Sequence, residues 1–144
     1  MSKRRKIMSN LDRFIKAQEN DYETALNEIE NGHKQSHWIW YIFPQLQGLG
    51  FSSMSQYYGI KDKEEAIDYM NHPVLRERLL EISQALLSLD CNDPVRVMGY
   101  PDNLKLQSSM TLFSIVSKEP VFQKVLDKFY DGQEDQSTLE KLKK

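Results

Sequence analysis

Apolar residues recur at steps of three and four positions along most of the chain, which is the spacing of one face of an α-helix. The first such run lies between Asn10, which is able to cap a helix, and Gly32, which is placed to end one. We expect one long helix or two short ones here. The inward positions are Leu11, Phe14, Ile15, Gln18, Tyr22, Ala25, Leu26 and Ile29.

Further helical runs follow after residue 61. Asp62 can cap a short helix that ends near Met70, and Pro73 opens a longer one with an apolar stripe at four- and three-residue steps. A brief turn or helix is expected over 93–99, a longer helix after Pro101 and another over 120–130. We expect a buried contact between the stripes of the two longer helices. Their central residues are Leu79, Ile82, Leu86, Met110 and Phe113.

The segment 37–43 is apolar on every side, so a buried strand and a buried helix fit its pattern equally well. Ser36 as a cap and Pro44 as a terminator favour a short helix, and a strand would lack an obvious pairing partner elsewhere. The predicted fold class is therefore all-α, a single compact multi-helix domain with little or no sheet. We place this domain at 9–132, after a basic disordered tail at 1–8 and before a short, charged C-terminal helix at 133–144.

Composition changes this picture little. A chain of 144 residues with 40% apolar residues and a net charge of -2 is typical of an ordinary soluble domain, and a general nucleic-acid partner is not expected. No stretch approaches 18 apolar residues, so we expect no membrane span. A single cysteine, Cys91, permits no internal disulfide and suits a reducing compartment, so the predicted location is cytoplasmic. The oligomeric state stays open.

The distribution of acidic residues is more informative, because no Asp or Glu occurs from Asn31 to Lys61. Seven of the fifteen aromatic residues fall in this gap, between Trp38 and Tyr58. Hydrogen-bond donors accompany them, and no carboxylate is present to repel an anion. The gap therefore predicts a candidate site for a ligand.

A second acid-free stretch runs from Asn103 to Lys118, where Lys105, Ser108 and Ser109 share one helix face. If the two stretches meet, they form a pocket with aromatic walls and a floor of hydroxyls and lysines. Rings stack on aromatic walls, and phosphate accepts charge-assisted hydrogen bonds, so the predicted partner is an anionic, nucleotide-like small molecule such as one resembling ADP-ribose. The candidate ligand-binding residues are Lys34, Ser36, His37, Trp38, Trp40, Gln45, Lys105, Ser108 and Ser109.

A structural interpretation of the same residues stays open. Large aromatic side chains most often fill a core, and serines within a helix often bond back to the preceding turn. Lys105 would then be a solvated or ion-paired side chain. The alternative function is accordingly a non-catalytic structural or protein-interaction domain, and neither a reaction nor a cofactor is assigned.

Other chemistries find little support. His33 and His37 have the spacing of a zinc pair, but Gly32 and the expected helix start at Ser36 separate them, so no metal site is predicted. Cys91 follows Asp90 in a turn whose negative charge disfavours a thiolate. The glycine patterns of phosphate-binding loops are missing from the sequence.

Two long motifs, in this order, resemble a bacterial family catalogued as domain of unknown function eighteen-ten. The first runs Lys34-x-Ser36-His37-Trp38-Ile39-Trp40-Tyr41-Ile42-Phe43-Pro44-Gln45, and the second runs Asp102-x-x-Lys105-Leu106-x-Ser108-Ser109-Met110-Thr111-Leu112-Phe113. Between them lie Leu49-Gly50, His72-Pro73-x-Leu75-x-x-Arg78-Leu79 and Gly99.

The resemblance covers roughly 11–130. It implies a compact, mostly helical fold shared with a mycobacterial hypothetical protein, and no established activity. Some members of the family are labelled calpastatin. That name fits poorly, because calpastatin is a disordered, hydrophilic inhibitor, whereas this chain has amphipathic helices able to bury its two tryptophans.

Overall fold

The computed structural model describes residues 10–143, and most of them lie in helices. The helices are α2 (Asp12–Glu30), α3 (Ile39–Ile42), α4 (Ser53–Tyr58), α5 (Lys63–Asn71), α6 (Pro73–Leu87), α7 (Pro94–Met98), α8 (Asp102–Val116), α9 (Val121–Tyr130) and α10 (Gln136–Lys143). No strand is assigned within 10–143. The predicted all-α class is confirmed, while the basic tail predicted at 1–8 lies outside the described residues.

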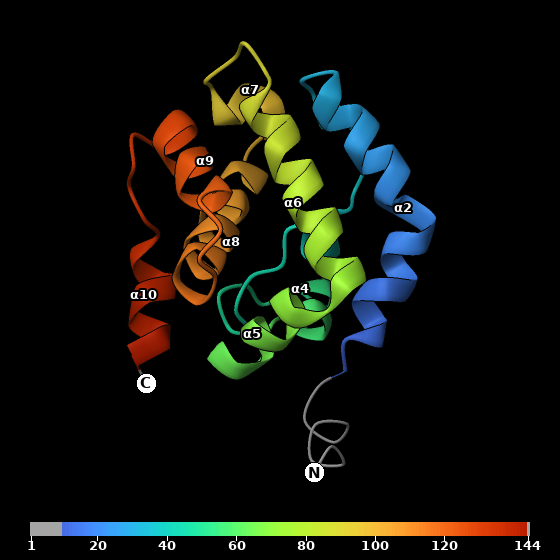
Figure 1. The fold of residues 1–144 in the computed structure, drawn as a ribbon, viewed down its shortest axis with the longest axis vertical. Coiled ribbons are helices and arrows are strands. Elements are labelled where there is room, and N and C mark those ends of the chain that lie inside the picture. The colour runs from blue at the N-terminus through green and yellow to red at the C-terminus, as the bar shows by residue number, and fades with distance from the viewer. Residues whose placement is uncertain (1–9, 144) are drawn as a thin grey trace.

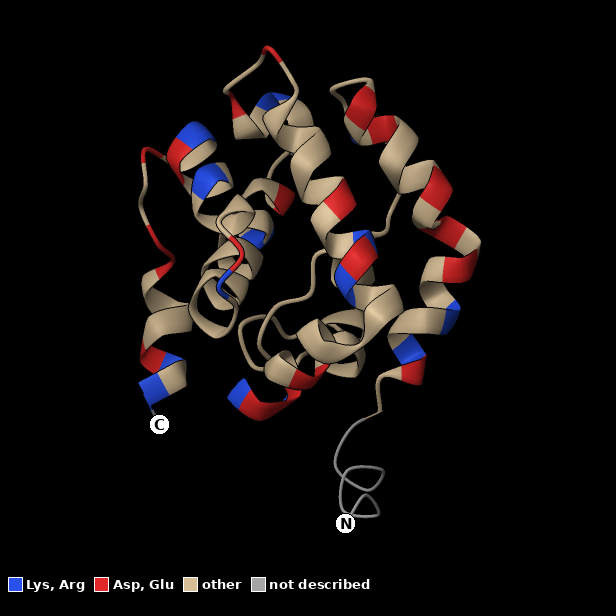
Figure 2. Cartoon of the chain, viewed as in Figure 1, with Lys and Arg blue, Asp and Glu red and all other residues tan. Residues whose placement is uncertain are grey.

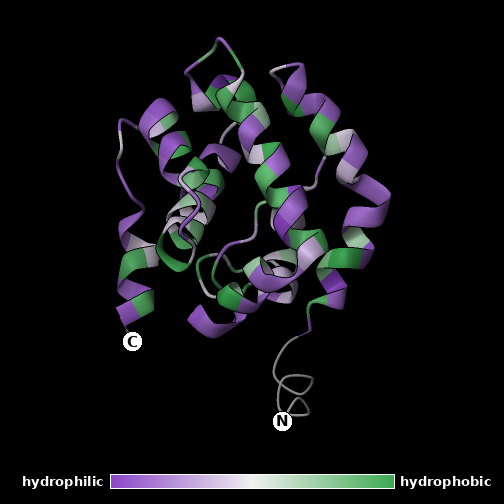
Figure 3. Cartoon of the chain, in the orientation of Figure 1, coloured by the Kyte–Doolittle hydropathy of each residue, from purple (hydrophilic) through white to green (hydrophobic). Residues whose placement is uncertain are grey.

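The long helix α6 lies between α2 and α9, while α8 packs against α9 and carries α10 on another side (Figure 1). Apolar and polar positions alternate around these helices, as Figure 3 shows for α6 and α9. The two predicted stripes are buried, as expected. Ser83 Oγ on α6 lies 4.0 Å from Met110 Sδ on α8, so α6 contacts the stripe of α8 in the core.

The segment 37–43, for which a strand and a helix were both possible, contains the short helix α3. The helical alternative is therefore the correct one. The rings of Trp38 and Phe43, on either side of α3, are buried in the core. The helix begins after Trp38, and Ser36 does not cap it. Asn10 likewise provides no side-chain cap to α2, which starts after Leu11 as one continuous helix.

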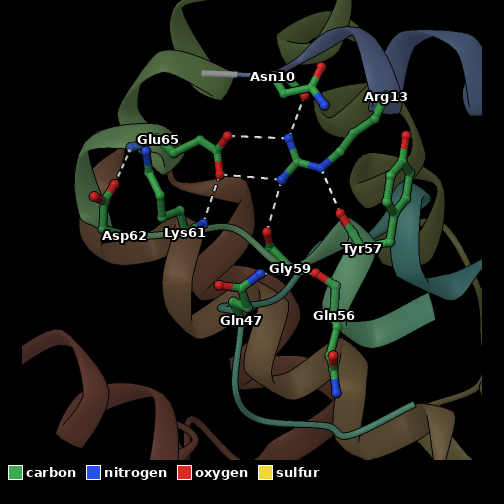
Figure 4. Close-up of polar contacts among 9 residues, drawn as sticks. All are labelled: Asn10, Arg13, Gln47, Gln56, Tyr57, Gly59, Lys61, Asp62 and Glu65. Atoms are coloured by element: carbon green, nitrogen blue, oxygen red, sulfur yellow. Dashed lines mark hydrogen bonds and ion pairs between the residues drawn. The ribbon is translucent and has the colours of Figure 1, made fainter. Parts of the chain in front are cut away.

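A buried ion pair joins α2 to α5 (Figure 4). The Arg13 guanidinium donates to both carboxylate oxygens of Glu65 at 3.2 and 3.3 Å. It also donates to the carbonyls of Tyr57 and Gly59 at 2.8 and 2.9 Å, and to the carbonyl of Asn10. Because every remaining donor finds an oxygen, the cost of burying this pair is offset and the loop before α5 is held in place.

The same carboxylate fixes the start of α5. Glu65 Oε1 accepts a hydrogen bond from the backbone N–H of Lys61 at 2.7 Å, and the Glu65 N–H donates to Asp62 Oδ1 at 2.9 Å. The predicted cap at Asp62 is therefore confirmed. An isolated parallel bridge pairs Leu46 with Ile60, so the chain on either side of α4 is tied together beside α5.

Candidate anion-binding site

The loop between α2 and α3 is held by one carboxylate. Glu28 accepts hydrogen bonds from the backbone N–H groups of Gln35 and Ser36 at 2.8 and 2.9 Å. It also accepts from Ser36 Oγ at 2.6 Å and from Trp38 Nε1 at 2.9 Å. Acidic residues recur along α2 (Figure 2), so this helix supplies the charge that the acid-free segment lacks.

The protonation of Glu28 follows from these contacts. Desolvation by burial would raise the pKa of this carboxyl group, but the hydrogen bonds from Ser36, Gln35 and Trp38 stabilise the charged form and lower the pKa to about 2. Glu28 is therefore an anion at neutral pH. The donors of Ser36 and the Trp38 indole already bind a carboxylate of the chain itself.

The two motifs meet at Asp102, the first residue of α8. Lys34 Nζ lies 2.8 Å from Asp102 Oδ2, and Lys105 Nζ lies 3.5 Å from Asp102 Oδ1. Lys34 also donates to the carbonyl of Ser36 at 2.5 Å and lies 4.8 Å from the centre of the Trp38 ring. Two cations thus share the Asp102 carboxylate, and the anionic Glu28 contacts Ser36 and Trp38 beside Lys34.

The side chains of this cluster differ in their access to solvent. The Lys34 side chain is only 6% exposed, and its backbone N–H donates to the carbonyl of Val97 at 2.7 Å. The Lys105 side chain is 24% exposed, and His37 lies on the surface of the loop. Lys105 and His37 are therefore accessible to solvent, whereas the Lys34 side chain is almost fully covered.

Ser108, one of the two predicted serines of α8, faces α10 rather than the lysine cluster. Ser108 is buried, and its hydroxyl contacts Asp135 Oδ2 at 2.9 Å and the carbonyl of Leu104 at 3.1 Å. Asp135 also accepts from the Thr138 N–H at 3.1 Å, at the start of α10. Ser108 thus docks α10 onto α8, although it shares a helix with Lys105.

Three further candidate residues, Trp40, Gln45 and Ser109, form no hydrogen bond with the lysine cluster within residues 10–143. Trp40 is half-buried, and its Nε1, like the hydroxyl of the buried Ser109, has no hydrogen-bond partner among the described residues. The backbone carbonyl of Gln45 accepts from the Ile60 N–H at 2.7 Å. A cavity of about 10 Å³ borders Trp40 and Gln45, which is room for about one water molecule rather than for a nucleotide.

The structure thus brings Lys34, Lys105 and Trp38 together, whereas Ser108 faces α10. The carboxylates Glu28 and Asp102 are not among the candidate ligand-binding residues derived from the sequence, because both lie just outside the acid-free segments. Tyr100, two residues before Asp102, is also outside that set, and it is 75% exposed. Its position between a glycine and a proline, which indicates a turn, is the only sign in the sequence that this ring is exposed.

Within residues 10–143, no three His, Cys, Asp or Glu side chains gather closely enough to hold a metal ion. None of the described helices combines the length and the apolar character that crossing a membrane requires.

The fold and this cluster define an all-α protein whose polar centre joins two sequence motifs. Residues 8–142 match the family described as "Protein of unknown function (DUF1810)", and the chain belongs to this family.

Its structure is similar to the crystal structure of the conserved hypothetical protein Rv1873 from Mycobacterium tuberculosis. The two share 39% sequence identity and a TM-score of 0.91, over 93% of this chain and 96% of that chain. No curated protein matches the chain. The resemblance inferred from the two motifs is confirmed.

Proposed function

We propose that this protein binds a small phosphate-bearing, nucleotide-like molecule where the loop 33–38 meets the start of α8. The observation that carries the proposal is the sharing of Asp102 by Lys34 and Lys105, at 2.8 and 3.5 Å. A phosphate can accept charge-assisted hydrogen bonds from the two lysines. The proposal concerns binding, and it assigns no reaction.

The exposed residues of this corner would make the contacts. Lys105 and His37 are accessible to solvent and would donate to the phosphate, and the covered Lys34 would add its charge. The ring of Trp38 is buried, so we assign stacking with the ligand's ring to Tyr100, which is 75% exposed. For the other residues of the nine-residue site derived from the sequence, a role in ligand binding stays a prediction.

A thermal-shift screen against nucleoside phosphates and ADP-ribose tests the proposal, because a ligand at about 100 times its dissociation constant stabilises a protein by about 2.7 kcal/mol. We expect at least one ligand to raise the melting temperature of the wild-type protein and of Lys118→Ala, which loses an exposed lysine two residues beyond α8. Lys105→Ala should abolish most of that shift. Equal shifts in both variants would contradict the assignment of Lys105.

The second candidate is a non-catalytic structural or protein-interaction domain. The observation in its favour is that Glu28 and Asp135 already accept hydrogen bonds from Ser36 and Ser108. On this account no ligand of the panel stabilises the protein, while Glu28→Gln still lowers its stability. Ligand-dependent stabilisation that is lost in Lys105→Ala would reject this alternative.

A further inference from the structure

We propose that a cavity between α5 and α10 is a second binding site, for a small phosphate monoester. The cavity has a volume of about 430 Å³, which falls within the range of about 300–1,000 Å³ found for ligand pockets. Three separate segments of the chain line it, at 46–47, 61–64 and 141–142. None of the residues assigned to the proposed function belongs to this lining.

The charge of the lining favours an anion. Three lysines and two acidic residues surround the cavity, and one of the acids, Asp62, is committed to capping α5 through its hydrogen bond from the Glu65 N–H at 2.9 Å. Among the described residues, neither Lys63 nor Lys141 forms an ion pair. Two lysine side chains from different helices are thus available to a phosphate, which lysine binds as a point charge.

The wall on the α5 side is held in place before any ligand arrives. The buried carboxylate of Glu65, paired with Arg13, accepts the Lys61 N–H at 2.7 Å, as Figure 4 shows. The Gln47 N–H donates to the carbonyl of Ile60 at 2.8 Å, which joins the two segments behind the lysines. A preorganised wall lowers the ordering cost of binding.

The end of the Lys141 side chain lies against the loop at 47–50. Gly48 has a φ of 96°, and a Cβ atom built on it would lie 2.7 Å from Lys141 Nζ. The amine therefore lies directly against the loop at the edge of the cavity. Leu46 and Leu142 supply apolar surface for the carbon skeleton of a monoester, beside the charged groups that would hold its phosphate.

Isothermal titration calorimetry with glycerol 3-phosphate tests this proposal, with glycerol as the uncharged counterpart. We expect binding of glycerol 3-phosphate and none of glycerol. Lys141→Glu should weaken binding about tenfold or more, because it replaces a charge-assisted donor by a like charge. Lys143→Glu makes the same change of charge on the same helix but outside the cavity lining, and it should leave binding unchanged.

Hydrogen exchange of the α10 amides shows whether Lys141→Glu keeps this helix in place. If it does not, Lys63→Glu on α5 replaces it and should weaken binding to the same extent. The proposal is overturned if glycerol 3-phosphate does not bind at millimolar concentration. Equal loss of binding in the Lys141 and Lys143 variants would also overturn it, since this would show a general effect of charge.

Discussion

Single carboxylates determine how the polar residues of the two motifs are used. Glu28 accepts hydrogen bonds from the backbone and side chain of Ser36 and from the indole of Trp38. Asp102 lies between Lys34 and Lys105. Both acids compensate donors that the acid-free segments leave unpaired, so the local chemistry of those segments depends on residues next to them in the chain.

Replacement of Glu28 by glutamine measures how much its carboxylate contributes to the free energy of unfolding. We expect Glu28→Gln to lower the free energy of unfolding at pH 7 by about 2 kcal/mol, since hydrogen bonds to a charged group are worth about 1.5–3 kcal/mol and the amide accepts at only one atom. Chemical denaturation gives this value. Glu19→Gln, an exposed position on the same helix, is the control and should change stability little.

The pH dependence of stability gives a second measure of what the Glu28 carboxylate contributes to the fold. The pKa of Glu28 falls from 4.5 to about 2 in the folded protein, so its stabilisation is fully present above pH 4.5 and is lost as the pH falls toward 2. The difference in stability between the wild-type protein and Glu28→Gln should therefore narrow across this window. A constant difference down to pH 2 would contradict the assigned hydrogen bonds.

At the scale of secondary-structure elements, side chains from neighbouring helices complete the helix ends. Lys128 on α9 donates to the carbonyls of Leu86 and Leu87 at 3.1 and 3.0 Å, and to the carbonyl of Leu89. These carbonyls lie at the C-terminal end of α6, where the helix leaves acceptors unpaired and carries partial negative charge. The contact joins α6 to α9 at a point where apolar packing alone would leave oxygens unsatisfied.

We expect Lys128→Met to lower the free energy of unfolding by about 1–3 kcal/mol, because the apolar stem is kept while the cation is lost and the carbonyls become unsatisfied. Lys124→Met, on the same helix and exposed, should have a much smaller effect. Thermal and chemical unfolding measure both variants. Equal destabilisation would show that Lys128 does not cap α6.

The contact between α8 and α10 makes a separate prediction for Ser108. Ser108→Asp would place a second carboxylate against Asp135, whose Oδ2 lies 2.9 Å from the serine hydroxyl. We expect the amides of 136–143 to lose protection from hydrogen exchange through repulsion of like charges. Adding Asp135→Ser exchanges the two partners and should restore much of the protection. Undiminished protection in Ser108→Asp would place Ser108 outside the α8–α10 contact.

At the scale of the whole molecule, the buried stripes of α6 and α8 hold the fold together. Ile82 is fully buried, and truncation of a buried isoleucine to alanine costs about 2–5 kcal/mol. We therefore expect Ile82→Ala to lower the melting temperature clearly. Val74→Ala, at an exposed position of the same helix, serves as the control. An unchanged melting curve for Ile82→Ala would mean that α6 does not pack as described.

The sequence predicts those parts of the fold that repeat along a single helix. The periodicity of α2 and α6, and the cap at Asp62, are local signals that reach only a few residues. The pattern of 37–43 is ambiguous because apolar residues lie on every side of it, and only its surroundings in the fold decide its conformation. Ser36 was expected to cap a helix, but Glu28 binds its hydroxyl instead.

The candidate site was predictable only in part, because its contacts join distant residues. The sequence marks Lys34 and Lys105, and Asp102 begins the second motif, but nothing in the sequence identifies Asp102 as the common partner of the two lysines. The pair of Arg13 and Glu65 is 52 residues apart, and no periodicity links its members. Long-range pairing depends on how the helices cross, which local patterns do not specify.

The meeting of the two motifs at one anion-accepting corner is the central claim, and an NMR titration tests it most directly. Amide spectra of the ¹⁵N-labelled protein would be recorded while ADP-ribose is added. We expect the shifts to concentrate at 33–38 and 100–105. Shifts confined to other parts of the chain, or none at millimolar ADP-ribose, would contradict it.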